Sequence, residues 1–176
     1  MDIETTGGTP RTSRLLEVGV IHVENHQVVG EYSQLVDPGT WIPPQITMLT
    51  GITDDDVTSA PTFRAISDDL LEILNGAVFV AHNAPFDFGF LQMEFDQIGV
   101  PFQPKVLDTV KLSRRLYPGV KGHKLSDLIE RFDFETKARH RAYDDAKVLW
   151  DFYRLMMAEF DLDTIEAAIH AQPKAR

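Results

Sequence analysis

The chain has 176 residues, 43% of them hydrophobic, and a formal net charge of −10 at pH 7, which suits one globular domain with a sizeable core. It contains no cysteine, which excludes disulfides and thiolate metal sites, and no apolar run approaches the roughly 20 residues needed to cross a bilayer. We therefore expect a cytoplasmic protein with no membrane partner.

The first part of the chain predicts strands. Residues 2–4 form an extended start, and residues 15–23 and 27–36 have the composition of two strands joined by a hairpin turn. Residues 37–45 are rich in Pro and Gly and predict a loop. A helix is expected over residues 61–76, where apolar side chains recur at helical spacing.

The second part predicts strands that alternate with helices. We expect a buried strand at 77–82, a helix at 86–98, a short strand at 106–110, and then the helices and tail that follow. These are a basic helix ending near 117–119, a helix at 125–132, a long helix with an apolar stripe through residues 149–160, and a short helix with a polar tail in 162–176. Hairpin strands followed by alternating strands and helices indicate a mixed α/β sheet covered on both faces.

The charge is unevenly distributed. Residues 105–141 contain ten Lys or Arg and five Asp or Glu, a net charge of +5, so the remainder carries −15. A cationic face of this kind can contact a phosphate backbone that the rest of the chain repels. A solvated helix face is the alternative interpretation.

Acidic residues stand at the ends of several predicted elements. Asp2 and Glu4 lie on the same side of an extended segment, because side chains alternate along a strand. Asp87 falls in the first turn of the helix that follows a strand, and His140 precedes Asp145 at the opening of the long helix. A bare Asp-x-Glu pair is common on surfaces, but these residues together form a constellation.

Such a constellation restricts the chemistry. Clustered carboxylates raise one another's pKa, so they stay ionised only when cations neutralise them. Oxygen ligands select Mg²⁺ or Mn²⁺, and two such ions roughly 4 Å apart form the clamp used in phosphoryl displacement. An ordinary imidazole, with a pKa of about 6.5, is suited to accept the proton of the attacking water. The sequence therefore predicts a phosphodiesterase.

Three segments carry a family resemblance. "DIETTG", "HNAPFDFGFL" and "HRAYDDA" resemble the exonuclease motifs of the DEDD family, and the form of the third is similar to its DEDDh branch. The resemblance covers residues 1–155 and is to the epsilon proofreading subunit of bacterial DNA polymerase III and its stand-alone relatives. It implies an RNase H-like mixed sheet of about five strands, the three N-terminal ones antiparallel, with helices on both faces.

The resemblance also implies roles for individual residues. Two divalent cations, Mg²⁺ or Mn²⁺, would be held by Asp2, Glu4, Asp87 and Asp145, with His140 as the general base. Substrate contacts would come from Thr5, Thr6, Leu49, Thr50, Ile52, His82, Asn83 and Phe86. His82 has a second interpretation, as a structural hydrogen-bonding residue. Asp144 neighbours Asp145 but points about 100° away on a helix, so we do not assign it to the metals.

The implied activity is removal of nucleotides from DNA 3′ ends, in proofreading or DNA repair, with release of nucleoside 5′-monophosphates. The partners would be a single-stranded or frayed DNA 3′ end, and a DNA polymerase or a fused or partner nuclease domain. Two alternatives stay open: an RNA exonuclease of the oligoribonuclease or RNase T type, and a catalytically inactive interaction module.

The two ends of the chain depart from the family pattern. Only Met1 precedes Asp2, where the family has several apolar residues, so we expect a truncated first strand that reflects a misassigned start, a trimmed chain or a real loss. Residues 162–176 resemble the connector to a GIY-YIG endonuclease domain. We accordingly expect an exonuclease domain at 1–160, and a C-terminal helix and tail or a linker at 161–176.

Overall fold

The structure of the chain is a computed structural model that describes residues 1–170. The predicted polar tail at 171–176 lies outside the described residues. Three antiparallel strands come first, in the order β1-β2-β3: Asp2–Thr5, Leu15–Glu24 and Gln27–Leu35. A parallel pair follows, β4 (Val78–Ala81) and β5 (Lys105–Asp108). The prediction of a mixed α/β fold with three antiparallel N-terminal strands is confirmed.

The first strand is short and lies beside the parallel pair. β1 has four residues, and the amino group of Met1 donates a hydrogen bond of 2.7 Å to the carbonyl oxygen of Val80 in β4. Met1 and Ile3 are buried in the main core. This hydrogen bond links the antiparallel strands to the parallel pair, so the ends of β1 and β4 lie close together.

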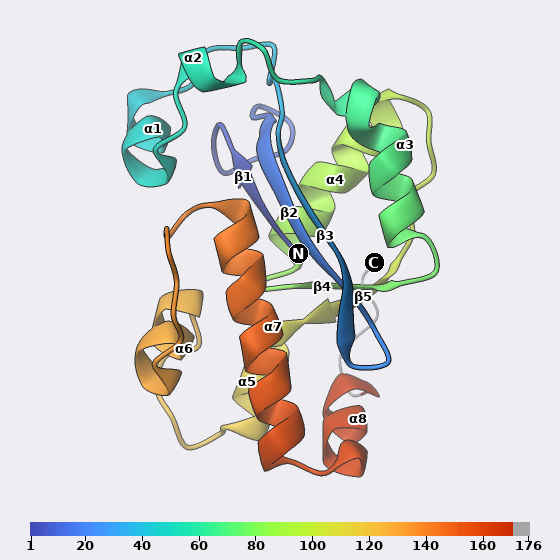
Figure 1. The fold of residues 1–176 in the computed structure, drawn as a ribbon, viewed down its shortest axis with the longest axis vertical. Coiled ribbons are helices and arrows are strands. Elements are labelled where there is room, and N and C mark those ends of the chain that lie inside the picture. Colours follow the sequence, from blue (N-terminus) through green and yellow to red (C-terminus); the bar gives the residue numbers. More distant parts are fainter. Residues whose placement is uncertain (171–176) are drawn as a thin grey trace.

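Eight helices surround the strands within the described residues (Figure 1). They are α1 (Pro44–Thr50), α2 (Asp54–Val57), α3 (Phe63–Leu74), α4 (Pro85–Gln97), α5 (Thr109–Leu116), α6 (Leu125–Phe132), α7 (Ala142–Glu159) and α8 (Leu162–His170). None of these helices combines the length and apolar character needed to span a membrane.

The period-two alternation of β2 separates two layers of helices. Val18 and Val20 join the core cluster that contains the apolar faces of α3 and α4. Gly19, between them, faces α7 on the other side of the sheet. The strands are therefore covered by α3 and α4 on one face and by α7 on the other, as the sequence predicts.

The segment between β3 and α3 differs from the prediction. From the sequence we expect a loop at 37–45 and assign no element to 46–60, whereas α1 begins at Pro44 and α2 at Asp54. Proline at the start of α1 and a capping box between Thr53 and Asp56 at the start of α2 stabilise these helices. Both helices are too short for hydrophobic periodicity to show them in the sequence.

The last described helix packs on the rest of the chain. Ile165 and Ala168 of α8 are buried in a cluster with Leu112 of α5 and with Phe152 and Met156 of α7. The domain boundary at residue 160 and the linker role of the C-terminal segment stay predictions.

Candidate active site

The site begins with two acids on β1. Asp2 pairs with Gly19 and Glu4 with Glu17 across the β1–β2 ladder. Ile3, between the two acids, is buried in the main core, so alternation places Asp2 and Glu4 on the opposite face. That face is the one toward α7.

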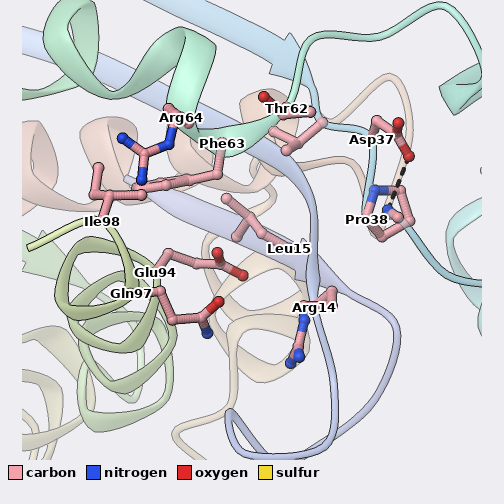
Figure 2. A pocket seen from close by; sticks show the side chains of 12 residues that line it. Arg14, Leu15, Asp37, Pro38, Thr62, Phe63, Arg64, Glu94, Gln97 and Ile98 are labelled. Carbon is pink, nitrogen blue, oxygen red and sulfur yellow. Dashed lines mark hydrogen bonds between the residues drawn. The ribbon is translucent and has the colours of Figure 1, made fainter.

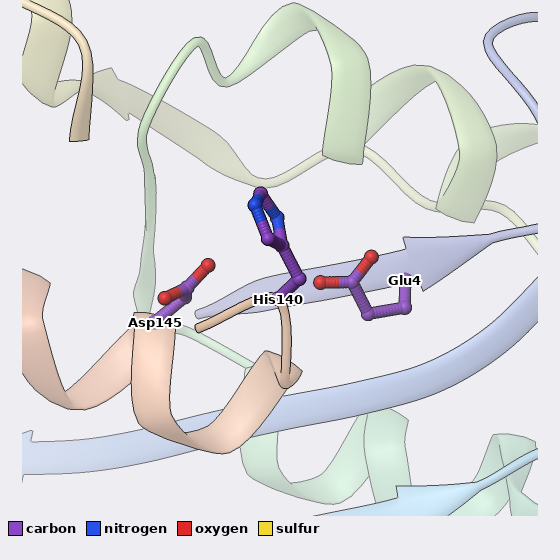
Figure 3. Close-up of side chains that lie close together, drawn as sticks. All are labelled: Glu4, His140 and Asp145. Atoms are coloured by element: carbon purple, nitrogen blue, oxygen red, sulfur yellow. The ribbon is translucent and has the colours of Figure 1, made fainter. Parts of the chain in front are cut away.

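Two further acids come from helix starts. Asp87 lies in the first turn of α4, directly after β4, and is 2% exposed. Asp145 lies in the first turn of α7 and is 4% exposed. Glu4, His140 and Asp145 each offer a ligand atom, and these atoms lie within 4.8 Å of one another. Figure 3 shows the three side chains around one shared space, brought from β1, the segment before α7, and α7 itself.

The carboxyl groups disfavour one another's ionisation. Burial, and then the neighbouring charges of Asp87, Asp145 and Glu4, raise the pKa of Asp2 well above its usual range. Burial and the same kind of repulsion raise the pKa of Glu4 to about 8, and burial raises that of Asp87 to about 7. Burial also raises the pKa of Asp145. Close, buried oxygen ligands of this kind fit hard divalent cations, which supply the missing positive charge.

The start of α7 is fixed to β2 by an ion pair with a buried acid that the sequence analysis missed. Glu17 is 2% exposed and accepts hydrogen bonds from Nε and Nη2 of Arg141, at 3.1 and 2.6 Å. It also accepts one of 2.9 Å from the backbone N–H of Ala142. The available signal was a charged residue inside the apolar run "LLEVGV", since such a residue needs a buried partner.

Close backbone contact completes this attachment. A Cβ atom on Gly19 would lie 2.2 Å from the carbonyl carbon of Ala142, so only glycine lets α7 approach β2 here. His140 has a left-handed backbone, with φ of 59°. Its neighbour Arg139 contacts Asp145 through a guanidinium–carboxylate hydrogen bond. The residues on both sides of His140 are thus ion-paired, which orients this segment over β1.

Thr5 and Thr6, predicted to contact substrate, are buried and hydrogen-bonded within the turn after β1. Thr5 Oγ1 donates to the carbonyl oxygen of Gly7 at 2.8 Å, and Thr6 Oγ1 accepts from the backbone N–H of Arg14 at 2.8 Å. Their side chains therefore shape the turn that follows Glu4. Contacts from these residues to a nucleotide stay a prediction.

The predicted stacking segment divides into exposed and buried side chains. Leu49, on α1, is 50% exposed. Thr50 is buried and donates to the carbonyl oxygen of Ile46, and Ile52 is buried in a small cluster with Leu16. Met48, which the sequence analysis did not single out, is 85% exposed. Of the three predicted residues, Leu49 alone offers its side chain to a ligand.

His82 has a partner at each ring nitrogen. Nε2 lies 2.8 Å from the carbonyl oxygen of His123, and Nδ1 lies 2.8 Å from Thr109 Oγ1. Its ring therefore has no free polar atom for a substrate, which supports the structural alternative. Asn83 is exposed with a left-handed backbone, and Phe86 is half-buried against the ring of Phe90.

A separate pocket lies away from the acids. It has a volume of about 250 Å³ and is lined by residues of β2, α3, α4 and the segments that adjoin these elements, among them Arg14, Arg64 and Glu94 (Figure 2). None of the predicted site residues lines it. The acid cluster is thus distinct from this pocket.

The mixed α/β fold agrees with the RNase H-like architecture that the sequence resemblance implies. The solved structure of Exonuclease X in complex with 5′ overhanging duplex DNA resembles this chain with a TM-score of 0.72 and 25% identity, covering 96% of each chain. The sequence profile of the exonuclease family RNase_T matches residues 1–153. The chain belongs to this exonuclease family.

Two curated relatives are similar over most of this chain. The 3′-5′ exonuclease DinG of Bacillus subtilis (strain 168) is 37% identical over 84% of the chain, which spans 16% of the DinG protein. The DNA polymerase III subunit epsilon of Treponema pallidum (strain Nichols) is 33% identical over 97% of the chain and 81% of that protein. The predicted resemblance to the epsilon subunit is confirmed.

Proposed function

We propose that the chain is a metal-dependent 3′-5′ exonuclease that removes nucleoside 5′-monophosphates one at a time from DNA ends. The observation that carries this proposal is the convergence of Glu4, His140 and Asp145, whose ligand atoms lie within 4.8 Å of one another. The electrostatic influence of Asp87 on Asp2 adds the other two acids to the same cluster. Membership of the exonuclease family supports the same activity.

Each residue has a proposed role. Asp2, Glu4, Asp87 and Asp145 would hold two divalent cations, Mg²⁺ or Mn²⁺. Such ions supply an acidified water and charge stabilisation at the leaving 3′ oxygen. His140, which is half-buried beside Glu4 and Asp145, accepts the proton of the attacking water. The ion pair between Arg141 and Glu17 keeps His140 beside Asp145.

The proposed substrate is a single-stranded or frayed DNA 3′ end, in proofreading or repair in the cytoplasm. The name of one relative, a DNA polymerase III subunit, and the DNA in the structure of Exonuclease X favour DNA as substrate. The proposed partner is a DNA polymerase or a fused or partner nuclease domain. Leu49 would stack on the terminal base, and further contacts would come from Thr5, Thr6, Asn83 and Phe86. Thr50 and Ile52, whose side chains are buried, would support Leu49 from behind.

The test is digestion of a single-stranded DNA oligomer labelled at its 5′ end, in Mg²⁺ or Mn²⁺. Asp145→Ala should lower the rate by at least about a thousandfold, because it removes a ligand from a site that acts as a unit. Asp144→Ala is the matched control, since Asp144 precedes Asp145 on α7 and is less buried. It should stay within about threefold of the wild type. Full activity of Asp145→Ala would refute the assigned site.

The same assay addresses the two alternatives. A matched RNA oligomer should be digested more slowly than DNA, and the opposite preference would favour an RNA exonuclease. Calorimetric titration with Mn²⁺ should show binding that Asp145→Ala weakens. A folded wild-type protein that binds no divalent cation and digests neither oligomer would be an interaction module.

A further inference from the structure

The acid cluster contains a cation from the chain itself. Arg139 Nη1 donates a hydrogen bond to Asp145 Oδ1, and this is the sole ion pair between a side-chain cation and the four acids among residues 1–170. The Arg139 side chain is 30% exposed and that of Asp145 is 6% exposed. The Arg139 side chain is thus partly accessible to solvent, whereas the carboxylate that it contacts is buried.

The positive charge of Arg139 partly offsets the negative charge of the acid cluster. Burial raises the pKa of both Glu4 and Asp145, and the guanidinium of Arg139 partly offsets each rise. Its neighbour Arg141 instead contacts Glu17, outside the four acids, with three donor–acceptor contacts. The two arginines beside His140 therefore differ: Arg141 holds the backbone in place, whereas Arg139 contacts a proposed metal ligand.

A divalent cation held by the acid cluster would compete with Arg139 for the carboxylate of Asp145. Asp145 Oδ1 accepts the guanidinium hydrogen bond, and Asp145 is one of the residues whose ligand atoms surround the candidate metal position. A bound cation neutralises the carboxylate and weakens its attraction for Arg139. The guanidinium is then left partly exposed at the position where the proposed reaction requires a phosphate. Its planar set of N–H donors matches phosphate oxygens well.

We propose that Arg139 is a substrate-binding residue. In the metal-free protein it forms an ion pair with Asp145, and once divalent cations have bound it contacts the substrate phosphate. This inference rests on the proposed function, since it assumes that phosphate binds beside Asp145. It assigns two measurable effects to Arg139: weaker metal binding in the absence of substrate, and tighter phosphate binding in the presence of metal.

Two calorimetric titrations test the proposal on Arg139→Gln. Without substrate, Mn²⁺ should bind the variant about three- to tenfold more tightly, because no ion pair has to be broken first. With Mn²⁺ saturating, thymidine 5′-monophosphate should bind about three- to tenfold more weakly, because its phosphate loses a charged donor. Thymidine 5′-monophosphate belongs to the proposed product class and is not consumed during the titration.

Lys137→Gln is the matched control. Lys137 is exposed, lies two residues earlier in the same segment, and forms no ion pair with the acids in the described part of the chain. This control should stay within about twofold of the wild type in both titrations. An equal gain in Mn²⁺ affinity for both variants would indicate a general charge effect and overturn the proposal.

The remaining outcomes are also decisive. Unchanged or weaker Mn²⁺ binding by Arg139→Gln, or unchanged nucleotide binding, overturns the role of Arg139 while wild-type digestion of DNA leaves the proposed function intact. Failure of the wild type itself to bind Mn²⁺ and to digest DNA overturns the proposed function. Thermal melts check that each variant is folded. Arg139→Lys, which keeps the charge but loses the planar donors, should show intermediate nucleotide affinity and replaces the Gln variant if that one does not fold.

Discussion

Each carboxyl group of the acid cluster lies in surroundings that oppose its charge. Glu4 is half-buried, and after burial itself the charges of Asp145, Glu17 and Asp87 raise its pKa to about 8. Such residues reduce the stability of the metal-free protein, because a buried charge without a full set of partners is unfavourable. Their presence is explained by the cations that they are proposed to hold.

Glu4→Gln tests this conflict between stability and function. At pH 8 and without metal, the variant should be more stable than the wild type by about 1–3 kcal/mol, because a repelled carboxylate becomes a neutral amide. It should also lose the proposed activity and much of the stabilisation that Mn²⁺ confers. Thermal unfolding with and without Mn²⁺ measures both effects, and a less stable metal-free variant would contradict the argument.

Variants of Leu49 and Ile52 distinguish a residue that contacts substrate from one that packs in the core. Leu49→Ala should change the free energy of unfolding by less than about 0.5 kcal/mol, because the side chain is half exposed. It should raise KM for single-stranded DNA several-fold. Ile52→Ala should lower the free energy of unfolding by about 2–4 kcal/mol, because it leaves a cavity in a buried cluster.

Urea unfolding and steady-state digestion of DNA by the two variants provide the measurements. A large loss of stability in Leu49→Ala, with KM unchanged, would show that this residue packs rather than binds.

At the level of elements, the site depends on how α7 is attached to β2. The carboxylate of Glu17 accepts hydrogen bonds from Arg141 and from the backbone N–H of Ala142. Gly19 lets the backbones of β2 and α7 come into contact. This attachment brings Asp145 and the preceding His140 over the acids of β1. A small displacement of α7 would therefore separate the ligands of the candidate metal site.

Gly19→Ala tests that attachment. Its Cβ would lie 2.2 Å from a backbone atom of α7, so the helix has to shift, and we expect a loss of about 2–4 kcal/mol in the free energy of unfolding. Activity should fall at least about tenfold in the fraction that stays folded. Gly30→Ala is the control, because the nearest atom to its Cβ, in His22, is 3.7 Å away. Equal behaviour of the two variants in urea unfolding and DNA digestion would refute the close-contact argument.

For the whole molecule, the acid cluster predicts a link between pH, metal and stability. Burial is the largest cause of the raised pKa values in the cluster. It raises the pKa of Asp2 well above its usual range, that of Glu4 to about 8 and that of Asp87 to about 7. The folded protein therefore binds more protons than the unfolded chain between roughly pH 4 and pH 8. Its stability without metal should be greatest at the acidic end of this window and decrease as pH rises.

Thermal unfolding in EDTA checks this sign. The melting temperature should fall between pH 5.5 and pH 8 by several degrees, and Mn²⁺ should reduce or reverse the fall, because it binds the ionised carboxylates of the folded state. A melting temperature that rises across the same range without metal would contradict the raised pKa values.

Much of the fold was predictable because its elements are long or strongly patterned. The β2–β3 hairpin and the stripe on α7 follow directly from hydrophobic periodicity. The helices α1 and α2 were missed, because seven and four residues leave no readable period. In the candidate site, Glu4, His140 and Asp145 were found by motif, and the structure brings them together.

The sequence by itself determined which groups are available and where they stand along the elements: acids on alternate positions of β1, Asp87 and Asp145 in the first turns of helices, and an arginine on each side of His140. Tertiary structure decided which of these groups meet. Glu17 forms an ion pair with Arg141, which is 124 residues away in the sequence, and Arg139 forms one with Asp145. A single chain's local pattern does not encode such pairings, because burial and distance between remote segments arise only when β2 and α7 pack.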